Sequence, residues 1–165
     1  MELRNIMYTA QLDLDHPIAI RYPRGRGITI DWKQPFTKIE ISKGIQLKIG
    51  KKLAVLSIGA IAQNVTEAIK DIEVSHYDMR FAKPLDEKLL HTIFKKYDTI
   101  VTVEDGTKIG GFGSSVFEFA SIHHYKNIIK VIGIPDTFIE HGSVNELQKT
   151  IGLDVESLTN YFNLL

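Results

Sequence analysis

The chain has 165 residues, enough for one ordinary domain and too few for two comfortable ones. Its 20 basic and 20 acidic residues cancel, which argues against general nucleic-acid binding and requires any anion site to be local. It has no cysteine, which excludes disulfides, thiolate nucleophiles and cysteine-ligated zinc, and none of its apolar runs is long enough to cross a membrane. We therefore expect a cytoplasmic protein.

The first portion of the chain is predicted to be incomplete. Apolar residues recur at helical spacing over 3–12, a β-like run covers 18–22, and residues 23–37 have the composition of a loop. One helix and one strand cannot bury their own apolar faces. This portion is therefore predicted to be an arm, or a piece of another domain.

The pattern becomes regular from residue 38 onward. Apolar and β-branched runs predict strands at 38–50 (as a strand or hairpin turning at Gly44), 53–58, 74–79, 99–103 and 128–134. Helical spacing, supported by a cap at Asp86 and a capping box at Ser143 and Glu146, predicts helices at 61–72, 87–97, 113–124, 144–151 and 155–165. This alternation indicates βαβ crossovers, and hence a three-layer α/β/α domain over 38–165 with a mostly parallel sheet.

The stretch "RYPRGRG" (21–27) is the first candidate site, because it places Arg21, Arg24 and Arg26 on a segment built to bend. A guanidinium matches phosphate oxygens with a rigid fork of donors. The loop also follows the end of a predicted strand, where α/β proteins usually place ligands. From these residues alone, a solvated linker is the simpler interpretation.

The glycine-rich loop at 104–115, "EDGTKIGGFGSS", lies between a strand and a helix and could hold a phosphate at the helix N-terminus. It matches neither known phosphate-loop pattern, so close packing and unusual dihedral angles are the favoured reason for its glycines. In "DMRFAKPLD" (78–86), a local ion pair and a helix start are favoured over a catalytic acid. The six histidines do not have the spacing of a metal site, since His123 and His124 would point about 100° apart on a helix.

Five strings in the chain together resemble a known family. They are "IAIRYPRG", "LAVLSIGAIAQNVTEAI", "DMRFAKPLD", "TVEDGTKIGGFGSSV" and "IGIPDTFIEHG". In this order and spacing they are similar to the C-terminal part of the 1-deoxy-D-xylulose-5-phosphate synthases, thiamine-diphosphate-dependent relatives of transketolase. The resemblance covers essentially the whole chain.

The resemblance implies a five-stranded mixed sheet, mostly parallel, whose first strand, within 38–50, is antiparallel to the others. It also implies that residues 1–25 end a preceding pyrimidine-binding domain, that 26–37 are a linker and that 38–165 form the transketolase C-terminal domain.

The same resemblance implies that the full-length enzyme, a homodimer, uses thiamine diphosphate and Mg²⁺ to condense pyruvate with D-glyceraldehyde 3-phosphate, with loss of carbon dioxide. The product serves isoprene and thiamine biosynthesis. Arg24 would contact the substrate phosphate, while Arg21 and Arg26 receive no role. The chain lacks the family's Gly-Asp-Gly magnesium motif, its activating glutamate and its active-site histidines. We therefore expect an inactive fragment, cut just upstream of Met1, with no catalytic, cofactor-binding or metal-binding residue of its own and no nucleic-acid or membrane partner.

Two alternatives remain open. The chain could be a stand-alone dimerisation or interaction module with the transketolase fold. It could also be the C-terminal part of a 2-oxo-acid dehydrogenase β-type subunit.

Overall fold

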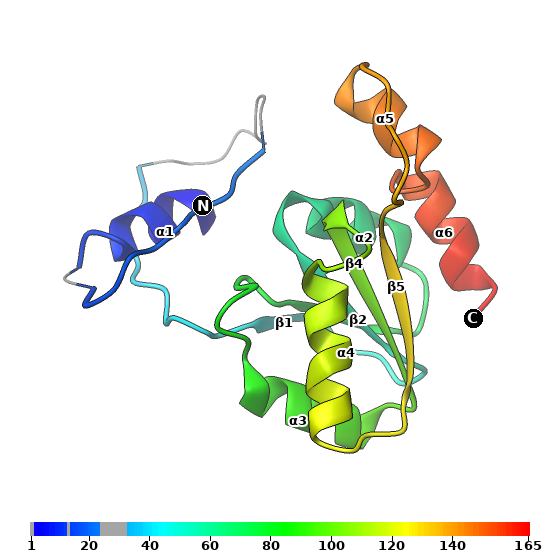
Figure 1. Cartoon of the computed structure of the whole chain (residues 1–165), viewed down its shortest axis with the longest axis horizontal. Coiled ribbons are helices and arrows are strands. Elements are labelled where there is room, and N and C mark those ends of the chain that lie inside the picture. Colours follow the sequence, from blue (N-terminus) through cyan, green and yellow to red (C-terminus); the bar gives the residue numbers. More distant parts are fainter. Residues whose placement is uncertain (1, 13, 24–32) are drawn as a thin grey trace. The chain divides into compact units, whose positions relative to one another are not determined.

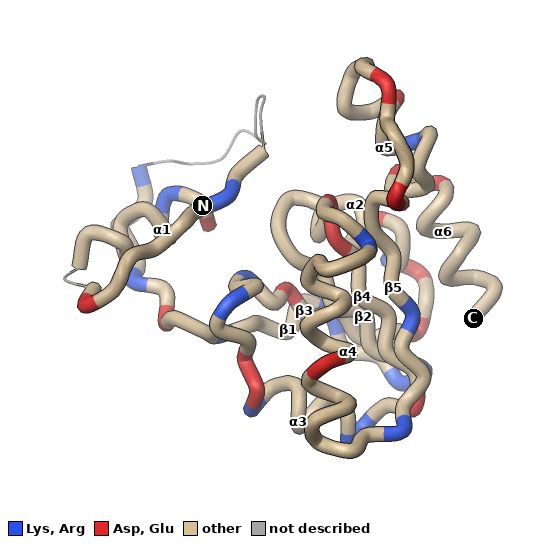
Figure 2. The backbone as a smooth tube through the Cα atoms, viewed as in Figure 1, with Lys and Arg blue, Asp and Glu red and all other residues tan. Residues whose placement is uncertain are grey.

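The computed structural model describes residues 2–12, 14–23 and 33–165, which fall into two units. Unit 1 is Met1–Ile41 and unit 2 is Ser42–Leu165. Figure 1 shows the elements of both. Acidic and basic residues are interspersed over unit 2 (Figure 2), as the balanced composition predicts.

Unit 2 is built on a five-stranded sheet with the order β1-β3-β2-β4-β5. The strands are β1 (Ile45–Lys48), β2 (Ala54–Ile58), β3 (Ser75–Asp78), β4 (Thr99–Thr107) and β5 (Ile128–Ile134). β1 pairs with β3 in antiparallel fashion, and the other three pairings are parallel. This confirms the mixed, mostly parallel sheet with an antiparallel first strand.

Helices cover both faces of this sheet. They are α2 (Ala62–Ala68, after a 3₁₀ turn at Gly59–Ile61), α3 (Glu87–Lys96), α4 (Phe112–Ile122) and α6 (Val155–Asn163). A further helix, α5 (Val144–Thr150), has no buried residue and precedes α6. The capping residues act as predicted: Asp86 accepts a hydrogen bond from the Leu89 amide, and Ser143 and Glu146 form a capping box. Asp154 caps α6 through the Ser157 amide.

The sheet divides the buried side chains into two clusters. One cluster joins the sheet to α3 and α4 through residues such as Leu90, Phe94 and Val116. The other joins it to α2 and α6 through residues such as Val65 and Phe162. Successive residues of β2 alternate between the two clusters, as expected for a strand buried on both faces. Unit 2 therefore has the three layers predicted from the sequence.

Unit 1 is organised around α1 (Glu2–Thr9), with residues 36–39 packed along it. The Thr9 hydroxyl donates to the Asn5 carbonyl at 2.7 Å and accepts from the Ile39 amide at 2.8 Å. The Thr37 amide donates to the Asn5 side chain at 3.2 Å. The Thr37 contact ties the end of the predicted linker to α1, and the Ile39 contact ties the first residues of the predicted C-terminal domain to the same helix.

Two local predictions were wrong. Residues 18–22 form no strand, because no other described segment pairs with them and a strand needs a partner for its backbone groups. The 38–50 segment is not a hairpin: only its second half forms a strand, β1, while the Ile39 amide bonds to Thr9 instead.

Candidate functional site

Arg24, the predicted phosphate-binding residue, lies outside the described residues, as does Arg26. The three residues that lead to them, Arg21, Tyr22 and Pro23, are exposed and have no regular secondary structure. The geometry of this loop therefore contributes nothing to the assignment of Arg24.

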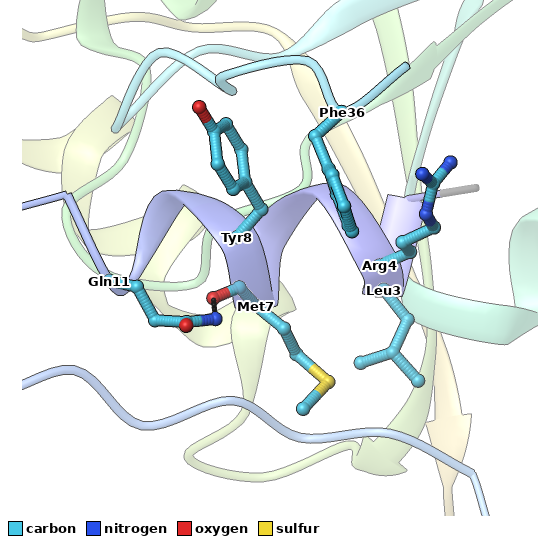
Figure 3. A pocket seen from close by; sticks show the side chains of 6 residues that line it. All are labelled: Leu3, Arg4, Met7, Tyr8, Gln11 and Phe36. Carbon is cyan, nitrogen blue, oxygen red and sulfur yellow. Dashed lines mark hydrogen bonds between the residues drawn. The ribbon is translucent and has the colours of Figure 1, made fainter. Parts of the chain in front are cut away.

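Unit 1 carries a hollow of about 470 Å³ on one side of α1, lined by Leu3, Arg4, Met7, Tyr8, Gln11 and Phe36 (Figure 3). The Phe36 ring stacks on Tyr8 with centroids 5.0 Å apart, and the Arg4 guanidinium lies 3.9 Å from the Phe36 centroid. The lining supplies apolar walls and one cation but no carboxylate, imidazole or hydroxyl nucleophile other than the phenol of Tyr8. It is suited to receiving apolar side chains rather than to catalysis.

The glycine-rich loop after β4 is closed by a carboxylate from the strand itself. Glu104 is buried, and its two side-chain oxygens accept from the amides of Phe112 (2.9 Å) and Gly113 (2.8 Å), the first residues of α4. A helix N-terminus leaves such amides without an intrahelical partner, and they attract anions. Glu104 occupies the position that a phosphate would need there.

Two glycines of this loop are required by close approach. A Cβ on Gly111 would lie 2.1 Å from the Thr107 carbonyl oxygen and 2.4 Å from Glu104 Oε2. A Cβ on Gly113 would lie 2.5 Å from Val131 Cγ1. The structure therefore supports the packing interpretation of the loop over the phosphate interpretation.

The 78–86 segment is also structural. The Asp78 side chain accepts from the Arg80 amide at 3.0 Å, and Arg80 adopts a positive φ of 56°. Asp86 is buried, caps α3 and accepts from the Gly44 amide at 3.2 Å, with the Lys43 ammonium 3.8 Å away. These contacts fix the start of α3 beside the entry to β1.

His76 and Ser57 form the one histidine–serine contact among the described hydrogen bonds, with 2.7 Å between Nε2 and Oγ. Both side chains are fully buried, so no substrate carbonyl can reach the serine. Burial, reinforced by the positive charge of Lys48, lowers the pKa of His76 to about 4. This pair is a neutral polar link between β2 and β3 and not a nucleophile with its base.

The other described histidines do not gather into a metal site either. The His91 imidazole contacts the Tyr125 hydroxyl through Nδ1 at 2.8 Å and the His123 ring with centroids 4.5 Å apart. Within residues 2–12, 14–23 and 33–165, no three His, Cys, Asp or Glu side chains are placed to hold a metal ion. Among the helices of those same residues, none has the length and apolarity needed to cross a membrane.

Residues 42–158 match the family described as "Transketolase, C-terminal domain". The chain belongs to this family. Its match excludes unit 1 and includes Glu104, His76 and the glycine-rich loop.

This transketolase C-terminal domain is similar to the C-terminal part of synthases from several bacteria. The chain is 51% identical over 164 residues to the 1-deoxy-D-xylulose-5-phosphate synthase of Bacteroides thetaiotaomicron, covering 96% of this chain and 25% of that protein. It is 41% identical over 165 residues to the synthase of Chlorobaculum tepidum, covering 96% and 26% respectively. The chain thus spans about a quarter of the length of these curated relatives.

A solved structure of a transketolase chain has a similar fold. The chain "Split gene transketolase, inactive beta4 tetramer" superposes with a TM-score of 0.70 at 28% identity, covering 78% of this chain and 43% of that one. This agrees with the α/β/α architecture of the transketolase C-terminal domain described above.

Glu104 is a structural detail of this domain that sequence reasoning missed. The signal was present as an acidic residue near the end of a strand that leads into a glycine-rich helix start. The pattern was interpreted only for its glycines, because nothing in the sequence shows that the carboxylate turns back onto amides eight and nine residues later.

Proposed function

We propose that this chain is the C-terminal quarter of a 1-deoxy-D-xylulose-5-phosphate synthase. The observation that carries the proposal is the 51% identity over nearly the whole chain to a curated synthase of which the chain covers 25%. The full-length enzyme joins pyruvate to D-glyceraldehyde 3-phosphate with loss of carbon dioxide. The relatives reported above are synthases and a transketolase, which favours this proposal over a 2-oxo-acid dehydrogenase subunit.

The proposal assigns different roles to the two units. Residues 1–25 end a preceding pyrimidine-binding domain, 26–37 link the domains and 38–165 form the C-terminal domain. The exposed apolar side chains of unit 1, including Leu3, Met7 and Phe36, support this, since they suit a helix that packs into a larger domain. In the enzyme, Arg24 binds the phosphate of glyceraldehyde 3-phosphate.

Thiamine diphosphate and Mg²⁺ are cofactors of the full-length enzyme under this proposal. The described residues do not fit them, because no three acidic or histidine side chains converge on a metal position and Glu104 fills the N-terminus of α4. We therefore assign no step of the reaction to unit 2. Calorimetric titration of the chain with thiamine diphosphate and Mg²⁺ is expected to give no saturable heat.

A chimera tests the proposal directly. The B. thetaiotaomicron synthase is produced with its matching C-terminal segment replaced by this chain, and formation of the pentulose phosphate from pyruvate and glyceraldehyde 3-phosphate is measured. We expect an active enzyme, because about half of the exchanged residues are identical. A chimera that folds cooperatively, binds the cofactor and yet forms no product would contradict the proposal.

The Arg24→Ala variant of the same chimera tests the phosphate assignment. A charge-assisted hydrogen bond contributes about 1.5–3 kcal/mol, so we expect kcat/KM for glyceraldehyde 3-phosphate to fall about ten- to a hundredfold or more. The kcat/KM for unphosphorylated glyceraldehyde should fall much less, and Arg24→Lys should restore part of the kcat/KM for the phosphorylated substrate. Arg26→Ala is the matched control. Equal losses for both aldehydes would assign Arg24 to loop structure instead.

A second candidate function is a separate assembly subunit with the transketolase fold. The observation that favours it is the similar solved chain, a split gene transketolase that forms an inactive tetramer. Sedimentation equilibrium distinguishes the candidates: a stable tetramer of this chain, together with an inactive chimera, would favour the assembly subunit.

A further inference from the structure

A groove of about 1210 Å³ runs beside β5, at the edge of the sheet. β5 pairs only with β4, so its other side is a free sheet edge among the described residues. Four consecutive residues of β5, Lys130–Gly133, line the groove. Figure 1 shows β5 at this side of the sheet, between α4 and α6.

The walls of the groove come from the two opposite layers of unit 2. α4 supplies Ser114, Phe117 and Glu118, and α6 supplies Ser157, Leu158 and Tyr161. Phe117 is 49% exposed, and Ile109 at the end of the groove is 68% exposed. Large apolar side chains thus stand beside an unpaired strand edge.

The charge of the groove is mainly positive. Lys108 and Lys130 line it, with Glu118 as the acidic member. A lysine on an edge strand discourages pairing with apolar or basic strands. An acidic strand is attracted by the same lysines, so these charges select a partner as well as exclude others.

We propose that this groove binds an extended segment of another polypeptide, which adds to β5 as a sixth strand. The segment carries apolar side chains at alternate positions, facing Phe117 on one wall or Tyr161 on the other, and carboxylates that reach Lys108 and Lys130. Main-chain hydrogen bonds to β5 give affinity, and the side-chain walls give specificity.

The shape of the groove favours a strand over a helix or a small molecule. Its floor is a row of successive strand residues and not a concave pocket with converging polar groups. The free N–H and C=O groups of an edge strand are satisfied by another strand, whereas a helix has none to offer them. The proposal does not rest on the synthase assignment, because it is argued from the free edge of β5 and from the residues that line the groove.

Two synthetic peptides as long as β5 test the proposal with the full chain. One alternates valine with glutamate and the other alternates valine with lysine, each with a solubilising tail. Binding is measured by fluorescence anisotropy, and amide hydrogen exchange is measured over 128–134. We expect saturable binding of the glutamate peptide only, with slower exchange of the β5 amides.

Charge reversal supplies the matched comparison. Lys130→Glu should lower the affinity for the glutamate peptide about tenfold or more and should allow the lysine peptide to bind. Lys126→Glu, an exposed lysine just before β5 that does not line the groove, should change affinity less than about twofold. Lys108→Glu replaces Lys130→Glu if that variant fails to show a cooperative thermal transition.

Four outcomes would overturn the proposal, three of them in the peptide experiments. They are no saturable binding of the glutamate peptide, binding without protection of the β5 amides, and an equal loss in the Lys126→Glu control. A dimer of the chain that protects the same amides would also overturn it, because the edge would then pair with a second copy.

Discussion

At the scale of single residues, the Glu104 carboxylate occupies the place at the N-terminus of α4 where an anionic ligand could otherwise bind. This buried carboxylate, beside Gly111, accepts hydrogen bonds from the first two amides of α4 at 2.9 and 2.8 Å. The negative charge also lies at the positive end of the helix dipole. The loop is therefore arranged around an internal anion.

We expect Glu104→Gln to lower the free energy of unfolding by about 1–3 kcal/mol. The amide keeps the shape of the side chain but places an NH₂ donor against one of the two backbone donors, and it removes the charge. Urea unfolding measures the loss. Asp105→Asn is the matched control, since that neighbouring carboxylate forms no hydrogen bond within the described residues, and it should change stability by less than about 0.5 kcal/mol. Equal losses of unfolding free energy in the two variants would show that Glu104 does not stabilise the chain by capping α4.

His76 gives the chain a specific acid sensitivity. The Thr66 hydroxyl donates to the Ala62 carbonyl at 2.8 Å, so its oxygen is left to accept from His76 Nδ1 at 3.3 Å. Nε2 then accepts from Ser57. The neutral imidazole thus has a hydrogen-bond partner at each ring nitrogen, in a buried site that disfavours its protonation.

The direction of the pH dependence follows from the pKa values. Burial lowers the pKa of His76 from 6.5 in the unfolded chain to about 4 in the folded chain, so the unfolded state binds the extra proton between these values. Stability is full above pH 6.5 and falls as the pH drops toward 4, by about 3 kcal/mol. Urea unfolding between about pH 7.5 and pH 4.5 measures this.

The variant His76→Gln isolates the contribution of this histidine from the other five. It should be less stable than the natural chain at neutral pH and should lose less stability on acidification. Parallel stability–pH curves for the two chains would show that His76 does not carry the effect.

At the scale of elements, the side chain of Lys48 in β1 caps the C-terminus of α2. Its ammonium donates to the carbonyls of Ile69, Lys70 (2.8 Å) and Ile72 (2.7 Å), just beyond the last residue of the helix. A cation at a helix C-terminus satisfies free carbonyls and complements the dipole. The short edge strand β1 is thereby fixed to α2.

We expect Lys48→Met to lower the free energy of unfolding by about 1.5–3 kcal/mol, because the stem remains while the charge-assisted hydrogen bonds are lost. Lys51→Met, at an exposed position nearby, serves as the control and should be nearly neutral. Thermal unfolding followed by circular dichroism measures both. Equal melting temperatures for the two variants would contradict the capping role of Lys48 and would mean that water satisfies the carbonyls after α2.

Elements with a clear local pattern in the sequence were predicted well, and the segment that lacks a partner in the fold was not. β5 was predicted with its observed bounds, and the caps of α3 and α5 were found from three-residue spacings. Residues 18–22 have the composition of a strand but no partner in the described chain. Strand propensity reflects how well a segment fits a sheet, so composition alone does not produce a strand.

At the scale of the whole molecule, unit 2 holds both buried clusters, whose members lie between residues 53 and 162. We therefore expect residues 42–165 alone to unfold cooperatively, with a Tm within about 5 °C of the full chain, which corresponds to about 1 kcal/mol for a domain of this size. Differential scanning calorimetry of the truncated chain measures this.

Residues 1–41 alone are the complementary test. A helix of eight residues with an extended segment is too short to be stable in water, so no cooperative transition is expected. A truncated unit 2 without a heat-absorption peak would contradict the independence of the domain.

The sequence by itself determined the fold class, the order of the elements in unit 2 and the family. The fold class and the element order follow from periodicity and from caps such as Asp86 and Ser143, whose partners lie three residues away. The family follows from the resemblance carried by five strings of the sequence. Chain geometry fixes contacts at that spacing, so a linear pattern is sufficient to find them.

Only the tertiary structure decided that Glu104 fills the phosphate position, that His76 is a buried neutral link and that β5 borders a groove. The partners involved are separated by eight or nine residues at α4, by 19 between Ser57 and His76, and by up to 53 between Lys108 and Tyr161 across the groove. Such contacts depend on how the strands register and which helix covers which face, and the register is set by the packing of the whole core.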